Sequence, residues 1–534
     1  MLAEAAADHL LVNGKVLTVD DEFAIAEAIA IKGEHIAAVG TDAEIRALAG
    51  PGTKVTDVGG KTVIPGLIDN HVHYFRGVPY WRWEAFLDAV DTRQRATEII
   101  AEKAAASAPG DWVLTIGGWD PDQFTDSSEE FTRAELDRLA PDNPAFIQHG
   151  FTGGVANSRA LEILGIDSNS GFIESVSKQG WGSRYGKNSG TGIPEVIRTA
   201  LPAYNEESWK ADYLAKGNED YNRAGVTTLW DAGGILYPNE FQQWAREYVE
   251  QNGGWSNLCI FANIKSDARD AADVDRLIQS IEDWPDLEDN DYFRVQGFGE
   301  MLYHPAYEVL GDLPWKESDD AYREYRRLVT AAAEKRWQII DHAMYAEKFD
   351  WMLDMFEEID KVHDIKPLRW SPHHCYAFTK DQFERAAELN LFLAMQTSPT
   401  LPRGPVAIYG GQDQPRMKSA QECGVKWGLG TDSKIVSPYP AFFTLYFAVT
   451  GRDVPGDIKN PTEKVSRQDA LIAHTRSNAW FLFQEDNLGS IEAGKYADIA
   501  VLDRDYMTVP EDEIRDIESV LTIVGGRVGY EASQ

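Results

Sequence analysis

Short apolar runs alternate with amphipathic, charged stretches along the chain after residue 220. This alternation is typical of parallel strands joined by helices, because a parallel connection must cross back to the edge from which it started. The apolar runs predict strands over residues 226–230, 258–264, 293–301, 337–344, 368–375, 391–396 and 426–432. The stretches between and after them predict helices over residues 271–283, 321–336, 349–362, 380–389 and 467–482.

An earlier apolar run, residues 63–73, supplies an eighth strand. Its apolar residues are nearly continuous, as expected of a strand that is buried on both faces in a parallel sheet. Eight strands with crossover helices predict the α/β class and a (β/α)8 TIM barrel. The active sites of such barrels lie at the C-terminal ends of the strands.

The two ends of the chain differ from its middle, because short β runs with turn signals fill residues 9–62 and 489–530. They predict a small β-sandwich built from both termini, over residues 1–64 and 483–534, beside a barrel over residues 65–482. Residues 74–220 separate the first two barrel strands and are too many for one crossover. We interpret them as an inserted subdomain that covers the barrel mouth like a lid.

Composition and charge exclude some classes of binding partner for this protein. The chain has 534 residues, 43% of them hydrophobic, and a net charge of −35 from 51 basic and 86 acidic residues. Such a field repels phosphate backbones and anionic lipids, so neither nucleic acid nor a membrane is expected as a partner. No apolar run approaches the roughly 20 residues of a membrane span, and the N-terminus lacks the pattern of a secretory signal. We therefore expect a cytoplasmic protein with a small-molecule substrate, and homo-oligomerisation stays open.

Candidate chemistry begins with His71 and His73, which end the first barrel strand. Alternate side chains of a strand share a face, so both imidazoles can bind the same metal ion. An isolated His-x-His is common by chance. This chain, however, has only eleven histidines and places several more at predicted strand ends.

Three other strands end in metal-binding residue types. The fifth run ends at His342, the sixth at His373 and His374, and the eighth at Asp432. Nitrogen and oxygen ligands in this combination suit zinc, iron or manganese and leave a position for water. Asp432 is the natural group to take a proton from that water and pass it to the leaving group. Considered alone, each histidine would be interpreted as a structural residue and Asp432 as a helix cap. The coincidence of all of them at the ends of predicted strands favours a metal site. Alternation turns only one of His373 and His374 inward.

Several motifs resemble the amidohydrolase superfamily, and more closely its "amidohydrolase 3" branch, which includes N-substituted formamide deformylases. They are residues 13–16 (NGKV), 65–73 (PGLIDNHVH), 430–433 (GTDS) with Ser437 and Pro438, and 488–499 (LGSIEAGKYADI). The resemblance implies a barrel with a sandwich and metal-dependent hydrolysis of C–N bonds. It assigns ligand roles to His71, His73 and His342, the sixth-strand histidine to His374, and the catalytic acid/base to Asp432.

One departure from the family bears on the metal. Binuclear relatives bridge two ions with a carboxylated lysine on the fourth strand, but residues 295–301 read VQGFGEM and contain no lysine. We therefore expect one divalent ion and no second ion. Zinc is the first choice, and iron or manganese are the alternatives. His71, His73, His342 and Asp432 would surround it, with His374 polarising the substrate carbonyl or holding the attacking water. Glu300 is a further candidate ligand, although a place at the rim of the site or behind the ligands is favoured for it.

The substrate pocket is expected to be aromatic. Candidate substrate-binding residues are Tyr74, Trp119 and Tyr376; Trp181 is another ring near the predicted mouth, and Arg76, Arg82 and Arg403 would suit a substrate carboxylate if they are not simply surface residues. The function expected is hydrolysis of an amide, formamide or cyclic amide of a small aromatic or apolar compound. The alternatives are a metal-dependent deaminase or decarboxylase on the same barrel, and a non-enzymatic binding or scaffold protein.

Overall fold

The computed structural model describes most of the chain. The described residues are 6–149, 153–174, 182–183, 186–187, 195–201, 207–233, 240–266, 268–283, 290–306, 319–397, 413–434 and 436–533.

Eight parallel strands form the centre of the molecule in two four-stranded sheets. The first sheet has the order β17-β16-β15-β8, with β8 at Leu67–Val72, β15 at Val226–Asp231, β16 at Cys259–Lys265 and β17 at Phe293–Gly299. The second has the order β18-β19-β20-β21, with β18 at Ile340–Ala343, β19 at Ser371–His374, β20 at Phe392–Gln396 and β21 at Lys426–Gly430. Parallel bridges Phe298–Ile339 and Val72–Ser433 connect the two sheets at both edges, which is consistent with a barrel. Each strand overlaps one of the eight predicted runs.

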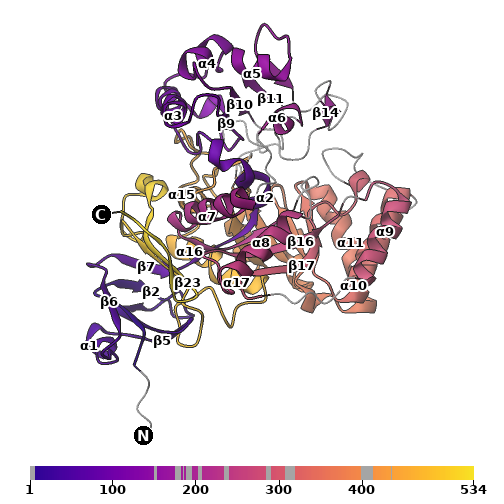
Figure 1. The fold of residues 1–534 in the computed structure, drawn as a ribbon. Coiled ribbons are helices and arrows are strands. Elements are labelled where there is room, and N and C mark those ends of the chain that lie inside the picture. Colours follow the sequence, from indigo (N-terminus) through magenta and orange to yellow (C-terminus); the bar gives the residue numbers. More distant parts are fainter. Residues whose placement is uncertain are drawn as a thin grey trace.

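Helices cover the outer face of these strands (Figure 1). They are α7 (Glu207–Arg223), α8 (Glu240–Gln251), α9 (Ala271–Asp283), α10 (Asp320–Lys335), α11 (Ala346–His363), α12 (Lys380–Glu388), α14 (Met417–Glu422), α15 (Ala441–Thr450), α16 (Arg467–Ala473) and α17 (Arg476–Phe481). The single helix predicted over residues 467–482 is divided in two. The carbonyl of His474, at the break, accepts a hydrogen bond from the amide of Ile68 at 2.8 Å, so β8 satisfies a group that a continuous helix would have used.

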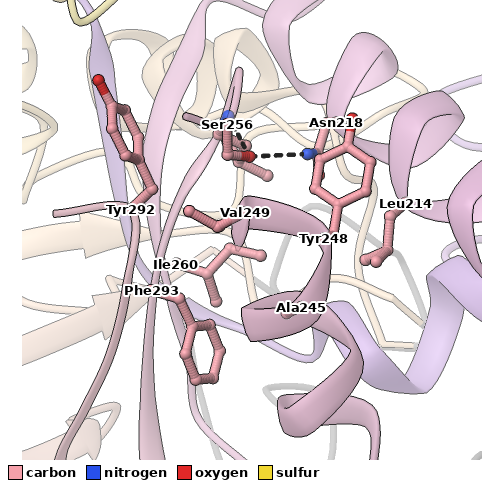
Figure 2. Close-up of a pocket in the computed structure, with 10 residues that line it drawn as sticks. Leu214, Asn218, Ala245, Tyr248, Val249, Ser256, Ile260, Tyr292 and Phe293 are labelled. Carbon is pink, nitrogen blue, oxygen red and sulfur yellow. Dashed lines mark hydrogen bonds between the residues drawn. The ribbon is translucent and has the colours of Figure 1, made fainter. Parts of the chain in front are cut away.

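The two faces of each strand have different neighbours. Figure 2 shows Ile260 and Phe293 on the outer face, against Ala245 and Val249 of α8. A hydrogen bond from Asn218 to Ser256 lies beside this contact. Alternate residues point inward instead, as pleating requires. Inside the strands a second apolar cluster includes Ile68, Trp230, Phe261, Ile340 and Phe392. The histidines described below lie above this cluster, at the strand ends.

Strands from both ends of the chain share one β unit. Its four-stranded sheet has the order β5-β4-β1-β6, with β1 at His9–Val12, β4 at Ala28–Lys32, β5 at His35–Gly40 and β6 at Lys54–Asp57. Its six-stranded sheet has the order β24-β23-β22-β7-β2-β3, with β2 at Lys15–Leu17, β3 at Ile25–Ala26, β7 at Thr62–Pro65, β22 at Ile499–Leu502, β23 at Ser519–Val524 and β24 at Arg527–Glu531. Residues of both sheets, among them Leu11, Ile29 and Val501, pack into one apolar cluster.

Described residues between β8 and α7 form a lobe, at the top of Figure 1. It contains a sheet of order β12-β11-β10-β9, with β9 at Val113–Thr115, β10 at Ala145–His149, β11 at Gly153–Ala156 and β12 at Phe172–Glu174. Helices α3 (Arg93–Ala106), α4 (Arg133–Leu139) and α5 (Ser158–Leu164) accompany this sheet. The buried ammonium of Lys434 joins the lobe to the segment after β21, because it lies 2.8 Å from Glu84 and 2.6 Å from Asp88. The domain boundaries and the action of the lobe as a lid stay predictions.

Within the described part of the chain, each helix is too short or too polar to span a bilayer.

Candidate metal centre

Six metal-binding side chains from five strand ends converge at one end of the parallel strands. They are His71, His73, Glu300, His342, His374 and Asp432. All six are buried, and none is more than 6% exposed. Their ligand atoms form three overlapping groups in which all atoms lie within 4.8 Å of one another. The tertiary structure therefore brings together the five candidate residues predicted from strand ends and the further candidate Glu300.

The first part of the centre is formed by His71 and His73 with the two carboxylates. Oδ1 of Asp432 lies 3.4 Å from Nε2 of His71 and 3.3 Å from Nε2 of His73. Glu300 places Oε1 3.8 Å from Nε2 of His71 and Oε2 3.7 Å from Nε2 of His73. Ligand atoms at the usual zinc distances of about 2.0–2.2 Å lie roughly 3.4 Å apart in a tetrahedron. These separations therefore suit a metal ion held between the four side chains.

The second part is formed by His342 and His374. Nε2 of His374 lies 3.2 Å from Oε1 of Glu300, and its Nδ1 lies 3.6 Å from Oδ2 of Asp432. The rings of His342 and His374 are 4.2 Å apart between centroids. Glu300 also joins these two histidines in a group that could hold an ion. Glu300 thus contacts both parts of the centre.

The position of Glu300 differs from the rim or outer location that the sequence favoured. Gly299 immediately precedes it with a φ of +147°, and a Cβ there would lie 2.0 Å from the carbonyl oxygen of Ile340. Only glycine allows this close passage beside the next strand. The carbonyl of Glu300 then accepts a hydrogen bond from the amide of His342 at 3.0 Å. The end of β17 is thereby fixed to β18, with the carboxylate among the histidines.

His374 is the candidate ligand of the sixth-strand pair, as the resemblance implied, and His373 is turned inward as well, towards His71. His374 has a φ of +76°, in the left-handed region, so its side chain leaves the alternating pattern. His373 is fully buried, and its Nδ1 makes a hydrogen bond with Nδ1 of His71. His373 therefore lies behind a candidate ligand, while His374 is itself a candidate ligand.

The protonation of the centre matches what metal binding requires. Burial, together with the charge of Arg76, lowers the pKa of His73 to about 4. Burial opposes ionisation of Asp432, but the contacts with His71 and His73 outweigh it and hold the pKa of this carboxyl well below its usual range. The same balance lowers the pKa of Glu300, where the charges of His73 and its neighbours outweigh burial. In addition, Nε2 of His71 is buried and makes no hydrogen bond within the described part of the chain. Ionised carboxylates beside a buried imidazole nitrogen that makes no hydrogen bond fit a divalent ion.

Residues outside the predicted site orient His73. Its Nδ1 lies 3.3 Å from the carbonyl oxygen of Gly233, an arrangement that leaves Nε2 for a metal. The carboxylate of Asp231 accepts hydrogen bonds from the amides of Gly233 at 2.8 Å and Phe75 at 2.9 Å. Burial raises the pKa of Asp231 to about 7. Asp231 was not among the predicted site residues, although it is a carboxylate that ends an apolar strand, the same signal that identified Asp432.

A buried lysine supports the strand that carries His342. Lys348 is 1% exposed, donates to the carbonyl oxygen of His342, and lies 3.1 Å from Oδ2 of Asp341. The hydroxyl of Tyr325 donates to the same carboxylate oxygen at 2.7 Å. Sequence patterns gave no signal for Lys348, because a charged residue in the first turn of a helix is usually exposed.

The predicted substrate residues lie in different places. Tyr376 stacks on His374 with ring centroids 5.9 Å apart, so it lies beside the centre. Tyr74 directs its hydroxyl to Oδ1 of Asn218 at 2.5 Å, and Trp119 lies in the apolar cluster of the lobe. Arg76 is 7% exposed and so is no surface residue, whereas Arg82 is exposed. Trp181 and Arg403 lie outside the described residues, and the substrate roles of Tyr74, Trp119 and Tyr376 stay predictions.

Comparison with known proteins agrees with this architecture. The chain is 27% identical to N-substituted formamide deformylase of Arthrobacter pascens, over 98% of each chain. Among solved structures, an uncharacterized metal-dependent hydrolase from Pyrococcus horikoshii OT3 matches with a TM-score of 0.63 and 19% identity, over 94% of this chain and 99% of that one. Atrazine chlorohydrolase TrzN from Arthrobacter aurescens TC1, complexed with zinc, matches with a TM-score of 0.54 and 17% identity, over 98% and 95%. These two structures share the fold. The model of the amidohydrolase family matches residues 54–530, and the chain therefore belongs to that family.

Proposed function

We propose that this protein is a metal-dependent hydrolase that cleaves the C–N bond of an amide, formamide or cyclic amide in a small aromatic or apolar compound. The observation that carries the proposal is the buried convergence of four histidines and two carboxylates at metal-ligand separations. Family membership and the full-length similarity to a formamide deformylase support the choice of a C–N bond.

The first part of the centre would hold the metal ion. His71 and His73 would hold an ion with Asp432 and Glu300, because their ligand atoms lie 3.3–3.8 Å apart. When bound, the ion would act as a Lewis acid and lower the pKa of water from 15.7 towards about 7. Zinc is the first choice, since zinc accepts mixed nitrogen and oxygen ligands and a protein of the same fold is known in complex with zinc.

Proton transfer falls to Asp432. Its Oδ1 faces the two ligand histidines and its Oδ2 faces Nδ1 of His374. During hydrolysis a water oxygen bonds to the carbonyl carbon, the C–N bond breaks, and the nitrogen takes up a proton. Asp432 would receive the proton from water and deliver it to that nitrogen, while His374 would polarise the carbonyl oxygen.

The number of ions has two candidate answers. The absence of a lysine from β17 supports one ion, as the sequence predicted. Oε2 of Glu300 lies near His73, and its Oε1 lies near both His71 and His374, so this carboxylate would also be able to serve a second ion. Elemental analysis of protein purified without added metal separates these cases as one or two ions per chain.

A second reaction type rests on the altered sequences of the fourth to sixth strand ends. Deamination or decarboxylation on the same metal centre would release ammonia or carbon dioxide in place of the products of amide cleavage. A panel of formamides, N-acyl amines, cyclic amides, aminoheterocycles and aromatic acids therefore identifies the reaction by its products. A binding or scaffold protein would turn over none of them.

Chelation and a matched pair of variants test the proposal. We expect the chelated protein to lose activity and to recover it with zinc, iron or manganese. His71→Ala should lose both metal and activity. His363→Ala should keep both, because His363 ends the 18-residue helix α11, roughly 25 Å from the start of that helix after β18. Full activity after rigorous chelation, or in His71→Ala, would contradict a metal-dependent mechanism.

A further inference from the structure

The backbone at the end of β19 adopts a conformation that side-chain-bearing residues rarely adopt. His374 and Cys375 have φ angles of +76° and +53°. Such values crowd the Cβ atom and persist when surrounding contacts hold the backbone in place. At His374 the left-handed turn also directs the imidazole to Glu300 and Asp432. The contact that holds this turn therefore controls a candidate metal ligand.

One side chain from the neighbouring strand makes that contact. Gln396 ends β20, is fully buried, and accepts the backbone N–H of His374 on its Oε1 at 2.5 Å. We infer that Gln396 is a positioning residue of the metal centre, which sets the direction of the His374 imidazole through this bond. The inference rests on the proposed function, since it concerns the same site.

The amide of Gln396 is itself held by two further amides. Its Nε2 donates to Oδ1 of Asn70 at 3.3 Å, and Nδ2 of Asn70 donates to Oδ1 of Asn478 at 2.8 Å. Asn478 in turn donates to the backbone carbonyls of Leu429, at 2.8 Å, and of Ile68. This series of amides connects β19, β20, β8, α17 and β21 beneath the centre. It fixes which end of the Gln396 amide faces His374.

Two glycines of β21 make room for these amides. A Cβ on Gly430 would lie 2.3 Å from Oδ1 of Asn70, and a Cβ on Gly428 would lie 2.0 Å from Oδ1 of Asn478. Any other residue at either position would displace an amide from its hydrogen bonds. The two glycines therefore leave room for the side-chain amides of Asn70, Gln396 and Asn478 just below the metal-binding side chains.

Loss of the bond has a specific expected consequence. Without an acceptor, His374 can return to an extended backbone, and alternation would then turn its imidazole away from the face that His373 occupies. His71, His73 and Asp432 lie on other strands and would stay in place. The expected defect is therefore a changed ligand environment with the rest of the metal site retained.

Substitution Gln396→Met tests the inference with the full-length protein loaded with cobalt(II). Methionine has a similar length and no amide, so the acceptor for His374 is lost. We expect the visible absorption bands of bound cobalt to change and the affinity for cobalt or zinc to fall about 10- to 100-fold, as is typical when support of a metal ligand is lost. Activity on a substrate found in the screen should show a lowered kcat, because His374 is proposed to act on the carbonyl.

Gln338→Met is the matched control. Gln338 is also a buried glutamine, 4% exposed, and donates to the carbonyls of Arg369 and Phe481 at 3.0 and 3.1 Å. It lies four residues before His342, roughly 13 Å along a strand. This variant should lose stability while its cobalt spectrum stays that of the wild type.

Three results would overturn the inference. They are an unchanged cobalt spectrum and metal affinity in folded Gln396→Met, the same spectral change in Gln338→Met, or, if Gln396→Met does not fold, a wild-type spectrum in Gln396→Asn. The asparagine variant keeps an amide but withdraws it by about 1.5 Å, one C–C bond. Failure of the wild type itself to bind cobalt or zinc would instead overturn the proposed function.

Discussion

Oε1 of Glu300 lies 3.2 Å from Nε2 of His374, while the other oxygen of the same carboxylate lies 3.7 Å from Nε2 of His73. One side chain thus lies close to histidines from two different strands, β8 and β19. Gln296, four residues earlier in β17, donates its amide to Gln338 at 2.8 Å and takes no part in the site. Glu300 is therefore the residue through which this strand reaches the metal-binding side chains.

Glu300→Gln is expected to lower metal affinity at least about 100-fold, because an amide keeps the shape but not the charge of a carboxylate ligand. Metal content after dialysis against a graded series of chelator concentrations measures the effect. Glu463→Gln serves as control, since Glu463 accepts hydrogen bonds from Ser419, on α14 and outside the centre. Wild-type metal content in Glu300→Gln would show that Glu300 is no ligand.

His373→Phe should weaken metal binding by about 10- to 100-fold, because it removes the partner of Nδ1 of His71 while keeping a planar ring. A competition titration with a zinc chelator gives the affinity. His474→Phe is the control: His474 is fully buried, and its ring nitrogens make no hydrogen bond within the described residues. Equal losses in both variants would mean that ring replacement, and not the bond to His71, is responsible.

Lys434→Met is expected to destabilise the protein by about 3–5 kcal/mol, because it leaves Glu84 and Asp88 as buried carboxylates without their cation. Urea unfolding measures the change. Lys216→Met removes a half-exposed partner of Asp220 and should cost less than about 1 kcal/mol. The triple variant Lys434→Met, Glu84→Gln, Asp88→Asn should recover part of the loss; no recovery would mean that packing of the lysine, and not its charge, stabilises this contact.

Asp498→Asn should change how stability depends on pH. Burial raises the pKa of Asp498 to about 6 from 3.8, so between these values the folded protein binds more protons than the unfolded chain. Stability contributed by this group is therefore full below about pH 4 and falls as the pH rises to about 6. The asparagine can still accept the amide of Gly525, which lies 2.8 Å from Oδ1 of Asp498, and cannot ionise.

The measurement is the difference in unfolding free energy between Asp498→Asn and the wild type from pH 4 to pH 6. The unfolding free energy of the variant minus that of the wild type should increase by on the order of 3 kcal/mol as the pH rises from 4 to 6. A difference that stays constant over this range would show that Asp498 ionises normally in the folded protein.

The sequence by itself predicted the eight strands, the helices over residues 271–283, 321–336, 349–362 and 380–389, and the residues at the strand ends. This succeeded because hydrophobic periodicity reports burial directly, and because parallel strands present their C-terminal ends on one side. His71, His73, His342 and Asp432 could be predicted to lie at one end of the strands on that ground alone, although the structure groups His342 with Glu300 and His374.

Only the tertiary structure decided how those ends are shaped. Periodicity carries no information on backbone turns after a strand ends, so it could not show the left-handed His374 held by Gln396, nor the inward turn of Glu300 after Gly299. The same holds for the break at His474, whose carbonyl pairs with a strand about 400 residues earlier in the chain. Each of these features depends on a hydrogen bond or close contact between distant segments, and such contacts exist only once the parallel strands have come together.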